Sequence, residues 1–476
     1  MTKSPVDVKS VQRNYLTKQE VEKRVQNGQI LIIYNNKVYK LNKWIKHHPG
    51  GELAIINLVG KDATDAINVF HPDYVFNSKI HNFYIGEYGP GDSEENIIYS
   101  QTSANEPELL LTLAKEKSIS MAFRRLESKI KERGLYDCNY WNYAYETVRY
   151  IILIITAWYL VIYGTTKFHY FISSICLGLF WHQLAFTAHD AGHNGITHSL
   201  YVDNLIGIFI ADFLGGLSIG WWKKNHYVHH IVTNHPEHDP DIQHLPFFAI
   251  TTKLFKDLYS SYYKRTLYFD SFARFFVSYQ HYLYYIILCF GRFNLYALSI
   301  NHLSSEKNLI FRNLEISSMI LFWCWFSYLL SYLPSLPTII LYILVSHMVT
   351  MILHVQITLS HFGMSTADYG PLESFPRKMC RTTMDVDCPW WMDWFHGGLQ
   401  FQTIHHLFPR IPRHNLRSCQ PLVKEFCEEV GIKYHIYGFV KGNGVVLSAL
   451  KDVANQVKLL KTVVNENNNK YFTTEE

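Results

Sequence analysis

The first part of the chain mixes polar and apolar positions in short blocks. An apolar, β-branched stretch at Ile30–Tyr34 predicts a strand, and the following Asn35-Asn36 pair predicts a tight turn. Polar stretches with helical spacing at Glu52–Leu58 and Asp62–Asn68 predict two short helices. We therefore expect a small soluble α+β domain over residues 11–90.

Four nearly charge-free runs then form two pairs, each pair joined by a short loop. They are Tyr150–Gly164, Phe171–Ala188, Ile316–Leu333 and Thr338–Ile357. A membrane-spanning helix needs about 20 apolar residues, so the first run must extend into the residues before it. The short connections favour two helical hairpins. We expect an all-α membrane domain with four transmembrane helices over residues 146–440.

Two further apolar runs carry charged or polar residues. Leu205–Trp222 contains Asp212, and Tyr279–Leu298 contains His281 and Arg292. A single crossing by the first run would place the histidine clusters at its two ends on opposite sides of the bilayer. We therefore expect interfacial or re-entrant helices in these two places.

The remaining segments are polar. Residues 91–145 should form a linker, opening at Pro90, and an amphipathic helix around Ser118–Arg133. Residues 441–476 should form a soluble C-terminal helix, with its periodic part at Val445–Val464, and a tail.

Composition supports a membrane protein. The chain is 48% hydrophobic, 16% aromatic and only 18% charged, and its net charge of +4 is too small to indicate a nucleic-acid partner. Its eight cysteines include no C-x-x-C pair, so we expect reduced thiols and no zinc site. Basic residues flank the hairpins on one side, which places the N-terminus, the histidine clusters and the C-terminus in the cytosol. These residues are Arg124, Arg125, Lys129, Lys131, Arg133, Arg149, Lys223, Lys224, Lys253, Lys256, Lys264 and Arg265.

Two histidines in the N-terminal domain are candidates for haem ligands. His48 stands in His-Pro-Gly-Gly-Glu, and His71 stands in Phe-His-Pro 23 residues later. Two facing imidazoles can occupy both axial positions of a haem iron, and such a haem transfers electrons only. With Trp44-Ile45 upstream, these motifs resemble the cytochrome b5 family. That resemblance assigns the two axial ligands of haem b to His48 and His71, and leaves His47 and His81 as surface residues.

Three histidine motifs lie near the ends of the hairpins. His189 and His193 form H-x-x-x-H, a spacing that places both rings on one helix face. The second motif is H-x-x-H-H at His226, His229 and His230, which also places its members on roughly one face, and the third is Q-x-x-H-H with Gln402, His405 and His406. Imidazole is a good ligand for iron.

The number of histidines favours two metal ions. The three motifs supply seven, and His361 after the fourth apolar run makes eight, which is too many for one iron and suits two. His347, His354 and His361 share a helical face at seven-residue steps. Intramembrane histidines are functional candidates. We expect His361 to be a ligand, and leave His354 and His347 open between ligation and buried hydrogen bonding.

Over residues 145–440 these motifs resemble the membrane fatty-acyl desaturase family. The resemblance implies a diiron centre held by the eight histidines. Glutamine at position 402, combined with an N-terminal cytochrome b5 domain, is typical of the front-end subgroup, and Gln402 would bind metal weakly or orient a ligand. Other polar residues near the motifs would either orient imidazoles or be ordinary loop residues. They are Asp190, Asn194, His235, His238, Asp239 and Asp241, while His182, His244, His396 and His414 receive no functional role.

The substrate class also comes from resemblance. Residues 360–375, 381–390 and 396–402 are similar to the fungal branch that desaturates sphingoid bases, which introduces a trans double bond at carbon 8 of the long-chain base of ceramide. Trp390, Trp391 and Trp394 suit the headgroup level of a bilayer. The family implies the endoplasmic reticulum membrane, O2, and NADH-derived electrons from a separate cytochrome b5 reductase, since the chain has no dinucleotide-binding fingerprint.

Three alternatives remain open from the sequence. A front-end fatty-acyl desaturase would act on phospholipid or acyl-CoA chains. A diiron lipid hydroxylase would use a similar set of eight histidines. A non-catalytic haem-bearing receptor or electron relay would bind haem and no other iron. Sequence alone leaves double-bond position and geometry, chain length, a free or glycosylated substrate and oligomeric state undetermined.

Overall fold

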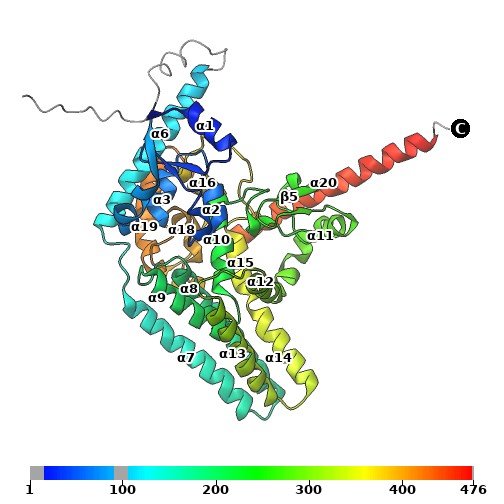
Figure 1. Ribbon diagram of the computed structural model, residues 1–476. Helices are drawn as coiled ribbons and strands as arrows, with labels where there is room; N and C mark the ends of the chain where they lie inside the picture. Colours follow the sequence, from blue (N-terminus) through cyan, green and yellow to red (C-terminus); the bar gives the residue numbers. More distant parts are fainter. Residues whose placement is uncertain (1–14, 90–105, 474–476) are drawn as a thin grey trace, which may run out of the picture. The chain divides into compact units, whose positions relative to one another are not determined.

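The structure is a computed structural model that describes residues 15–89 and 106–473 (Figure 1). The chain divides into two compact units, Met1–Ser118 and Ile119–Glu476. The polar linker that we expected to open at Pro90 falls on residues 90–105, which lie outside the described residues. Helix α6 (Glu106–Glu132), which begins after this gap, is longer than the amphipathic helix that we predicted.

The first unit contains a four-stranded sheet. Its strands are β1 (Tyr15–Leu16), β2 (Leu31–Tyr34), β3 (Lys37–Lys40) and β4 (Tyr84–Tyr88), in the order β1-β4-β3-β2. Strands β2 and β3 form the predicted hairpin, in which Tyr34 pairs with Lys37. Asn35 and Asn36 both have positive φ angles, 49° and 56°, as the tight turn of a hairpin requires.

Short helices cover this sheet, and each of its faces is apolar. They are α1 (Lys18–Gln26), η1 (Ile45–His47), α2 (Glu52–Ile56), α3 (Thr64–Phe70), α4 (Asp73–Ser78) and η2 (Ile80–Phe83). Because side chains alternate along a strand, Ile32 and Tyr34 enter one core with Ile55 and Ile67, while Leu31 enters the other. The α+β fold that we expected is confirmed.

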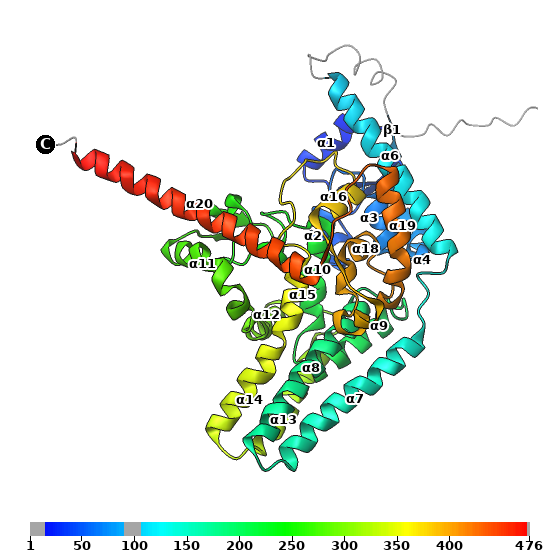
Figure 2. The ribbon, with the colours of Figure 1, turned by 180° about the vertical axis from the view of Figure 1, so that it is seen from behind.

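The second unit is mainly helical. Four of its helices are long and apolar enough to cross a membrane: α7 (Tyr140–Ile162), α8 (Lys167–Gly192), α13 (Arg312–Ser331), and the continuous pair α14 (Leu336–Val349) and α15 (Met351–Leu359). Helices α7, α8, α13 and α14 lie side by side in both views (Figures 1 and 2). Their core contains Trp181, Phe322, Phe326 and Tyr342. The four spans expected from the sequence are thus present, with longer bounds.

The two ambiguous apolar runs are sharply bent. The first comprises α9 (Leu200–Gly207) and the π-helix η3 (Ile208–Leu214), which meet α10 (Ile219–Val232) at 115°. The second comprises α11 (Ser271–Leu288) and α12 (Gly291–Ser305), which meet at 79°. Bends of this size fit the predicted re-entrant or interfacial helices better than straight crossings.

The bend before α10 is held by buried polar groups. Ser218 caps α10 by accepting from the amide of Trp221 (3.0 Å), and its hydroxyl donates to the carboxylate of Glu315 on α13 (2.6 Å). The carboxylate of Asp212 accepts from the amide of Ile219 (3.1 Å). Carboxylates at a helix N-terminus satisfy amides that have no partner within the helix and oppose the helix dipole. These contacts fix where the helix with the second histidine motif begins.

The rest of the unit lies at one end of the hairpins (Figure 1). Helices α16 (Phe375–Thr382), α17 (Asp393–His396), α18 (Gln402–Leu407), α19 (Leu416–Glu429) and α20 (Phe439–Thr473) follow the last hairpin, and the short 3-10 helices η6 (Trp390–Met392), η7 (Leu399–Phe401) and η8 (Arg413–Asn415) lie between them in the chain. Two more 3-10 helices, η4 (Pro240–Ile242) and η5 (Thr252–Phe255), follow α10. Two strand pairs depart from the all-α expectation: β5 (Leu258–Ser260) with β6 (Arg265–Leu267), and β7 (Asp385–Asp387) with β8 (Ile436–Gly438). Helix α20 packs along α11, where Gln280 donates to the carbonyl of Leu450 (2.8 Å).

Candidate metal centre and haem site

Four elements bring histidines together in the second unit. Helix α8 ends with the first motif, α10 carries the second, α18 carries the third, and His361 follows the last turn of α15. Six of these side chains are almost fully buried: His193, His229, His230, His361, His405 and His406. The structure therefore brings together all eight histidines that the sequence analysis selected.

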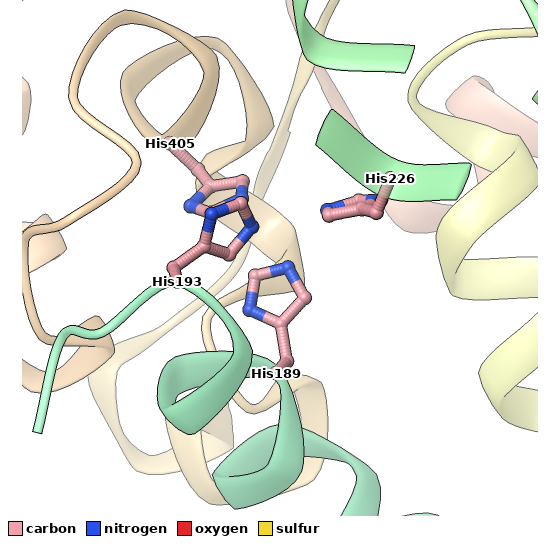
Figure 3. A group of neighbouring side chains, drawn as sticks. All are labelled: His189, His193, His226 and His405. Carbon is pink, nitrogen blue, oxygen red and sulfur yellow. The ribbon is translucent and has the colours of Figure 1, made fainter. Parts of the chain in front are cut away.

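Four of the histidines form a first group. These are His189, His193, His226 and His405, and one ring nitrogen from each lies within 4.8 Å of the others. Their rings point toward a common centre (Figure 3). The indole of Trp222, one turn before His226, stacks on the His226 ring at a centroid distance of 4.3 Å. Gly192 leaves room for that indole, since a Cβ there would lie 2.1 Å from it.

Three more histidines form a second group. His229, His361 and His406 each offer one nitrogen, and these atoms also lie within 4.8 Å of one another. The ring centroids of His229 and His361 are 4.7 Å apart, and those of His361 and His406 are 4.9 Å apart. Histidines of one motif therefore belong to different groups. In the third motif, His405 belongs to the first group and His406 to the second. In the second motif, His226 belongs to the first group and His229 to the second.

His230 lies between the two groups. Its Nε2 is 3.0 Å from Nε2 of His226 and 3.1 Å from Nε2 of His405. Its ring also stacks on His406, with centroids 4.1 Å apart. The H-x-x-H-H motif therefore reaches both groups from a single helix.

The residues fit metal ions. Buried polar atoms normally have hydrogen-bond partners, yet Nε2 of His189, both ring nitrogens of His193, Nδ1 of His361 and Nε2 of His406 have none among the described residues. Burial, followed by the neighbouring imidazoles, lowers the pKa of His193, His405 and His406 well below the ordinary value. Neutral imidazoles with uncommitted nitrogens are the form that binds metals.

His229 differs in its protonation. Burial alone would lower its pKa, but the carboxylates of Asp239 and Asp241 outweigh burial and raise the pKa to about 9. Nδ1 of His229 lies 2.9 Å from the Asp239 carboxylate. A carboxylate at Nδ1 orients the ring and presents Nε2 to a metal. Of the two roles that the sequence left open for Asp239, the structure shows the orienting contact.

The remaining candidates lie outside the two groups. Gln402 begins α18, one turn before His405, and is 5% exposed. The sequence left His347 open between metal ligation and buried hydrogen bonding, and the structure shows hydrogen bonding. Its Nε2 lies 3.2 Å from the Tyr296 hydroxyl, and its Nδ1 lies 2.8 Å from the Ile343 carbonyl. His354 packs beside Gly291, where a Cβ would lie 2.9 Å from its Nε2.

Several other polar residues have ordinary partners. His182 and His396 both contact the side-chain amide of Gln356, at 3.0 and 3.3 Å, and Nε2 of His414 lies 3.1 Å from Glu146. Asn194 donates to the Tyr227 hydroxyl (3.3 Å). His235 stacks on His238, with centroids 4.3 Å apart. Among the described residues, none of these side chains belongs to either histidine group.

Sequence reasoning missed two features of the site. Arg413 forms buried ion pairs with Asp190, beside the first motif, and with Glu146 of α7, and nothing in the spacing of these residues indicates it. The second feature is the stacking of Trp222 on His226. Trp222 stands four residues before His226 and so lies on the same helix face, a spacing that does predict this contact.

The first unit brings its two selected histidines face to face. The rings of His48 and His71 have centroids 6.0 Å apart, which admits a metal atom between them at metal–nitrogen bonds of about 2 Å. Nδ1 of His48 lies 3.1 Å from the Gly51 carbonyl, and Nδ1 of His71 lies 3.0 Å from the Ile67 carbonyl. These contacts occupy Nδ1 of each ring and leave Nε2 as the nitrogen for a metal.

The surroundings of this pair suit a haem. Burial lowers the pKa of His48, which keeps the ring neutral for ligation. Gly50 makes a close approach possible, because a Cβ there would lie 2.9 Å from Cε1 of His48. Gly51 has a φ of +84°, a conformation that favours glycine.

The fold and the two sites define a class: a membrane-bound metal enzyme with a fused haem-binding domain. Comparison with known proteins bears this out. Residues 165–438 match the model of the fatty acid desaturase family, and residues 17–89 match that of the cytochrome b5-like haem/steroid binding domain. The chain belongs to the fatty acid desaturase family and carries an N-terminal cytochrome b5-like domain.

Similar proteins cover almost the whole chain. A protein of Emericella nidulans named Delta 8-(E)-sphingolipid desaturase is 45% identical over 94% of this chain and 95% of its own length. A Kluyveromyces lactis protein of the same name is 43% identical over 93% of each chain. A Helianthus annuus protein named Delta(8)-fatty-acid desaturase is 37% identical over 96% of this chain and 94% of its own.

Proposed function

We propose that this protein is an oxygen-dependent desaturase that introduces a trans double bond at carbon 8 of the sphingoid base of ceramide. The observation that carries the desaturase reaction is the pair of buried histidine groups at the end of membrane-length helices. The substrate and the bond position rest on the sphingolipid desaturases that are 38–45% identical over most of the chain.

The two histidine groups would each hold one iron. His189, His193, His226 and His405 would hold the first and His229, His361 and His406 the second, with His230 between them. Two bound irons would supply the activation of O2, which takes two hydrogens from adjacent methylene carbons together with two electrons from the haem domain and two protons from water, and is reduced to two molecules of water. The side chains themselves would supply imidazole nitrogens, fix the ring orientations and exclude bulk water through burial. Gln402 would orient the third motif.

Electrons would reach this site from the first unit. His48 and His71 would ligate haem b, and a separate NADH-dependent cytochrome b5 reductase would reduce it. A tether between domains raises the effective concentration of the donor to about the millimolar range. We place the enzyme in the endoplasmic reticulum membrane with its N-terminus, histidine groups and C-terminus in the cytosol. Trp390, Trp391 and Trp394 are 76%, 57% and 48% exposed, which suits the headgroup level.

Product analysis tests the reaction. The chain is expressed in a host that lacks the activity, and its long-chain bases and fatty acids are analysed by mass spectrometry. Loss of two hydrogens from the sphingoid base supports the proposal, and gain of one oxygen would indicate a hydroxylase. A new double bond confined to fatty acids would instead favour a fatty-acid desaturase, the activity in the name of the Helianthus annuus relative.

Metal analysis tests the two sites separately. The purified enzyme should contain about three irons per haem, whereas a simple electron relay would contain one. His229→Ala should abolish desaturation and keep the haem spectrum, and His281→Ala on α11 is its control. His48→Ala should abolish the haem spectrum, and the exposed neighbour His47→Ala should not. Full activity in His229→Ala would refute the assignment of the second group.

A further inference from the structure

One loop touches every member of the second histidine group. Residues 233–239 connect α10 to η4 and contain three buried polar side chains, Thr233, Asn234 and Asp239, each no more than 1% exposed. Buried polar side chains in a loop are costly unless each is hydrogen-bonded. Their partners show what this loop does.

Asp239 fixes the ring of His229. Its two carboxylate oxygens lie 3.0 and 2.9 Å from Nδ1 of His229. The same carboxylate accepts from the backbone amides of Asn234 (2.7 Å) and Asp241 (2.9 Å), so it cannot rotate away. Asp239 therefore holds a proton on Nδ1 of His229, so Nε2 is the atom that would give up its proton and bind a metal in the second group.

Thr233 fixes the ring of His406 in the same way. Its hydroxyl donates to the carbonyl of His229 (2.8 Å) and lies 3.2 Å from Nδ1 of His406. Since that hydroxyl has only one proton, it accepts at its other contact, and Nδ1–H of His406 is the donor. This leaves Nε2 of His406, which has no partner among the described residues, as the atom for a ligand.

Asn234 holds the segment that carries His361. Its side-chain amide donates to the carbonyls of His361 (2.9 Å) and Thr382 (3.3 Å). Nδ1 of His361 has no partner in the described part of the chain. Asn234 itself has a φ of +58°, a left-handed conformation that asparagine tolerates better than most residues.

The first group is supported by longer contacts. Its nearest carboxylates are Asp190, 3.8 Å from Nδ1 of His189, and Asp241, 3.9 Å from Nδ1 of His226. Both ring nitrogens of His193 are without a partner among the described residues. The contacts of the loop at 2.9–3.2 Å are therefore specific to the second group.

We infer that Thr233, Asn234 and Asp239 are positioning residues that set the ring orientations of the second histidine group alone, so that the two metal positions can be emptied independently. This inference rests on the proposed diiron function. It predicts that substitutions in the loop remove one of the two non-haem irons and leave the other in place.

Iron counting in the detergent-purified full chain tests this. Non-haem iron per haem should fall from two in the wild type to one in Thr233→Val, Asn234→Ala and Asp239→Ala. Thr233→Ser keeps the hydroxyl and should retain two irons. Glu237→Gln changes an exposed residue of the same loop and should also retain two. The oxidised variants should show the EPR signal of an isolated high-spin ferric ion, which a coupled pair does not give.

The outcomes are distinguishable. Two irons retained in all three variants, or both irons lost together, would overturn the inference. If Asp239→Ala does not accumulate, the Thr233→Val and Thr233→Ser pair decides alone, because valine keeps the shape of threonine without the hydroxyl and serine keeps the hydroxyl without the methyl group. A wild-type chain that contains haem but no other iron would instead refute the proposed function.

Discussion

The buried ion cluster around Arg413 should be essential to the membrane unit. The guanidinium of Arg413 is 4% exposed and pairs with Asp190, which is 5% exposed, and with Glu146, which is 14% exposed. It also donates to the carbonyl of Phe186 (3.2 Å) and the hydroxyl of Thr187 (3.1 Å). One side chain thus joins the segment after the third motif to α7 and to the helix with the first motif.

Arg413→Met should destabilise the enzyme strongly. The change leaves two buried carboxylates without their counter-charge, and breaking a buried ion pair costs about 3–5 kcal/mol. This is a large part of a total stability of about 5–15 kcal/mol. Replacement of the whole buried cluster by uncharged groups removes the unpaired charges and is often nearly neutral. The triple variant Arg413→Met, Asp190→Asn, Glu146→Gln should therefore recover most of the loss.

Thermal unfolding in detergent measures both effects. At about 2–4 °C per kcal/mol, the single variant should melt on the order of 6–20 °C below the wild type, and the triple variant should melt well above the single one. Arg413→Lys keeps the positive charge but loses the planar guanidinium that contacts both carboxylates, so its melting temperature should lie between those of the single and the triple variant. A single variant that melts with the wild type, or a triple variant no more stable than the single, would refute this account of the cluster.

Three further predictions use close contacts and one titrating group. Gly50→Ala places a methyl group 2.9 Å from Cε1 of His48, so it should weaken haem retention without changing non-haem iron, as absorbance and iron analysis would show. Gly192→Ala places a methyl group 2.1 Å from the Trp222 ring and should cost about 1–3 kcal/mol in thermal unfolding, with reduced iron content. Burial raises the pKa of Asp385 to about 6 in spite of its hydrogen bonds, so the folded state holds a proton that the unfolded chain releases near about pH 4. Stability is therefore lost as the pH rises from about 4 through 6, and it levels off above that. The melting temperature of Asp385→Asn should rise relative to the wild type between about pH 4 and about pH 6, and an unchanged difference would contradict this.

The sequence by itself determined much of the architecture. Apolar runs of membrane length can only be satisfied as helices in lipid, so their number and pairing follow from local composition. The hairpin at Asn35-Asn36 follows from turn residues, since few residue types adopt its positive φ angles. The eight histidines were selected because metal chemistry restricts the choice of donor types.

Only the tertiary structure decided how these residues are used. His405 and His406 are adjacent, yet they serve different groups because successive side chains on a helix point about 100° apart. Asp239 was one of several candidates that the sequence could not separate, while Asn234 and Arg413 act on partners that lie far away in the sequence, so no spacing rule reveals them. The bend before α10 depends on Glu315 from another helix, and that bend sets the direction of the second motif. Local pattern defines which residues carry the chemistry, whereas long-range packing defines which of them meet.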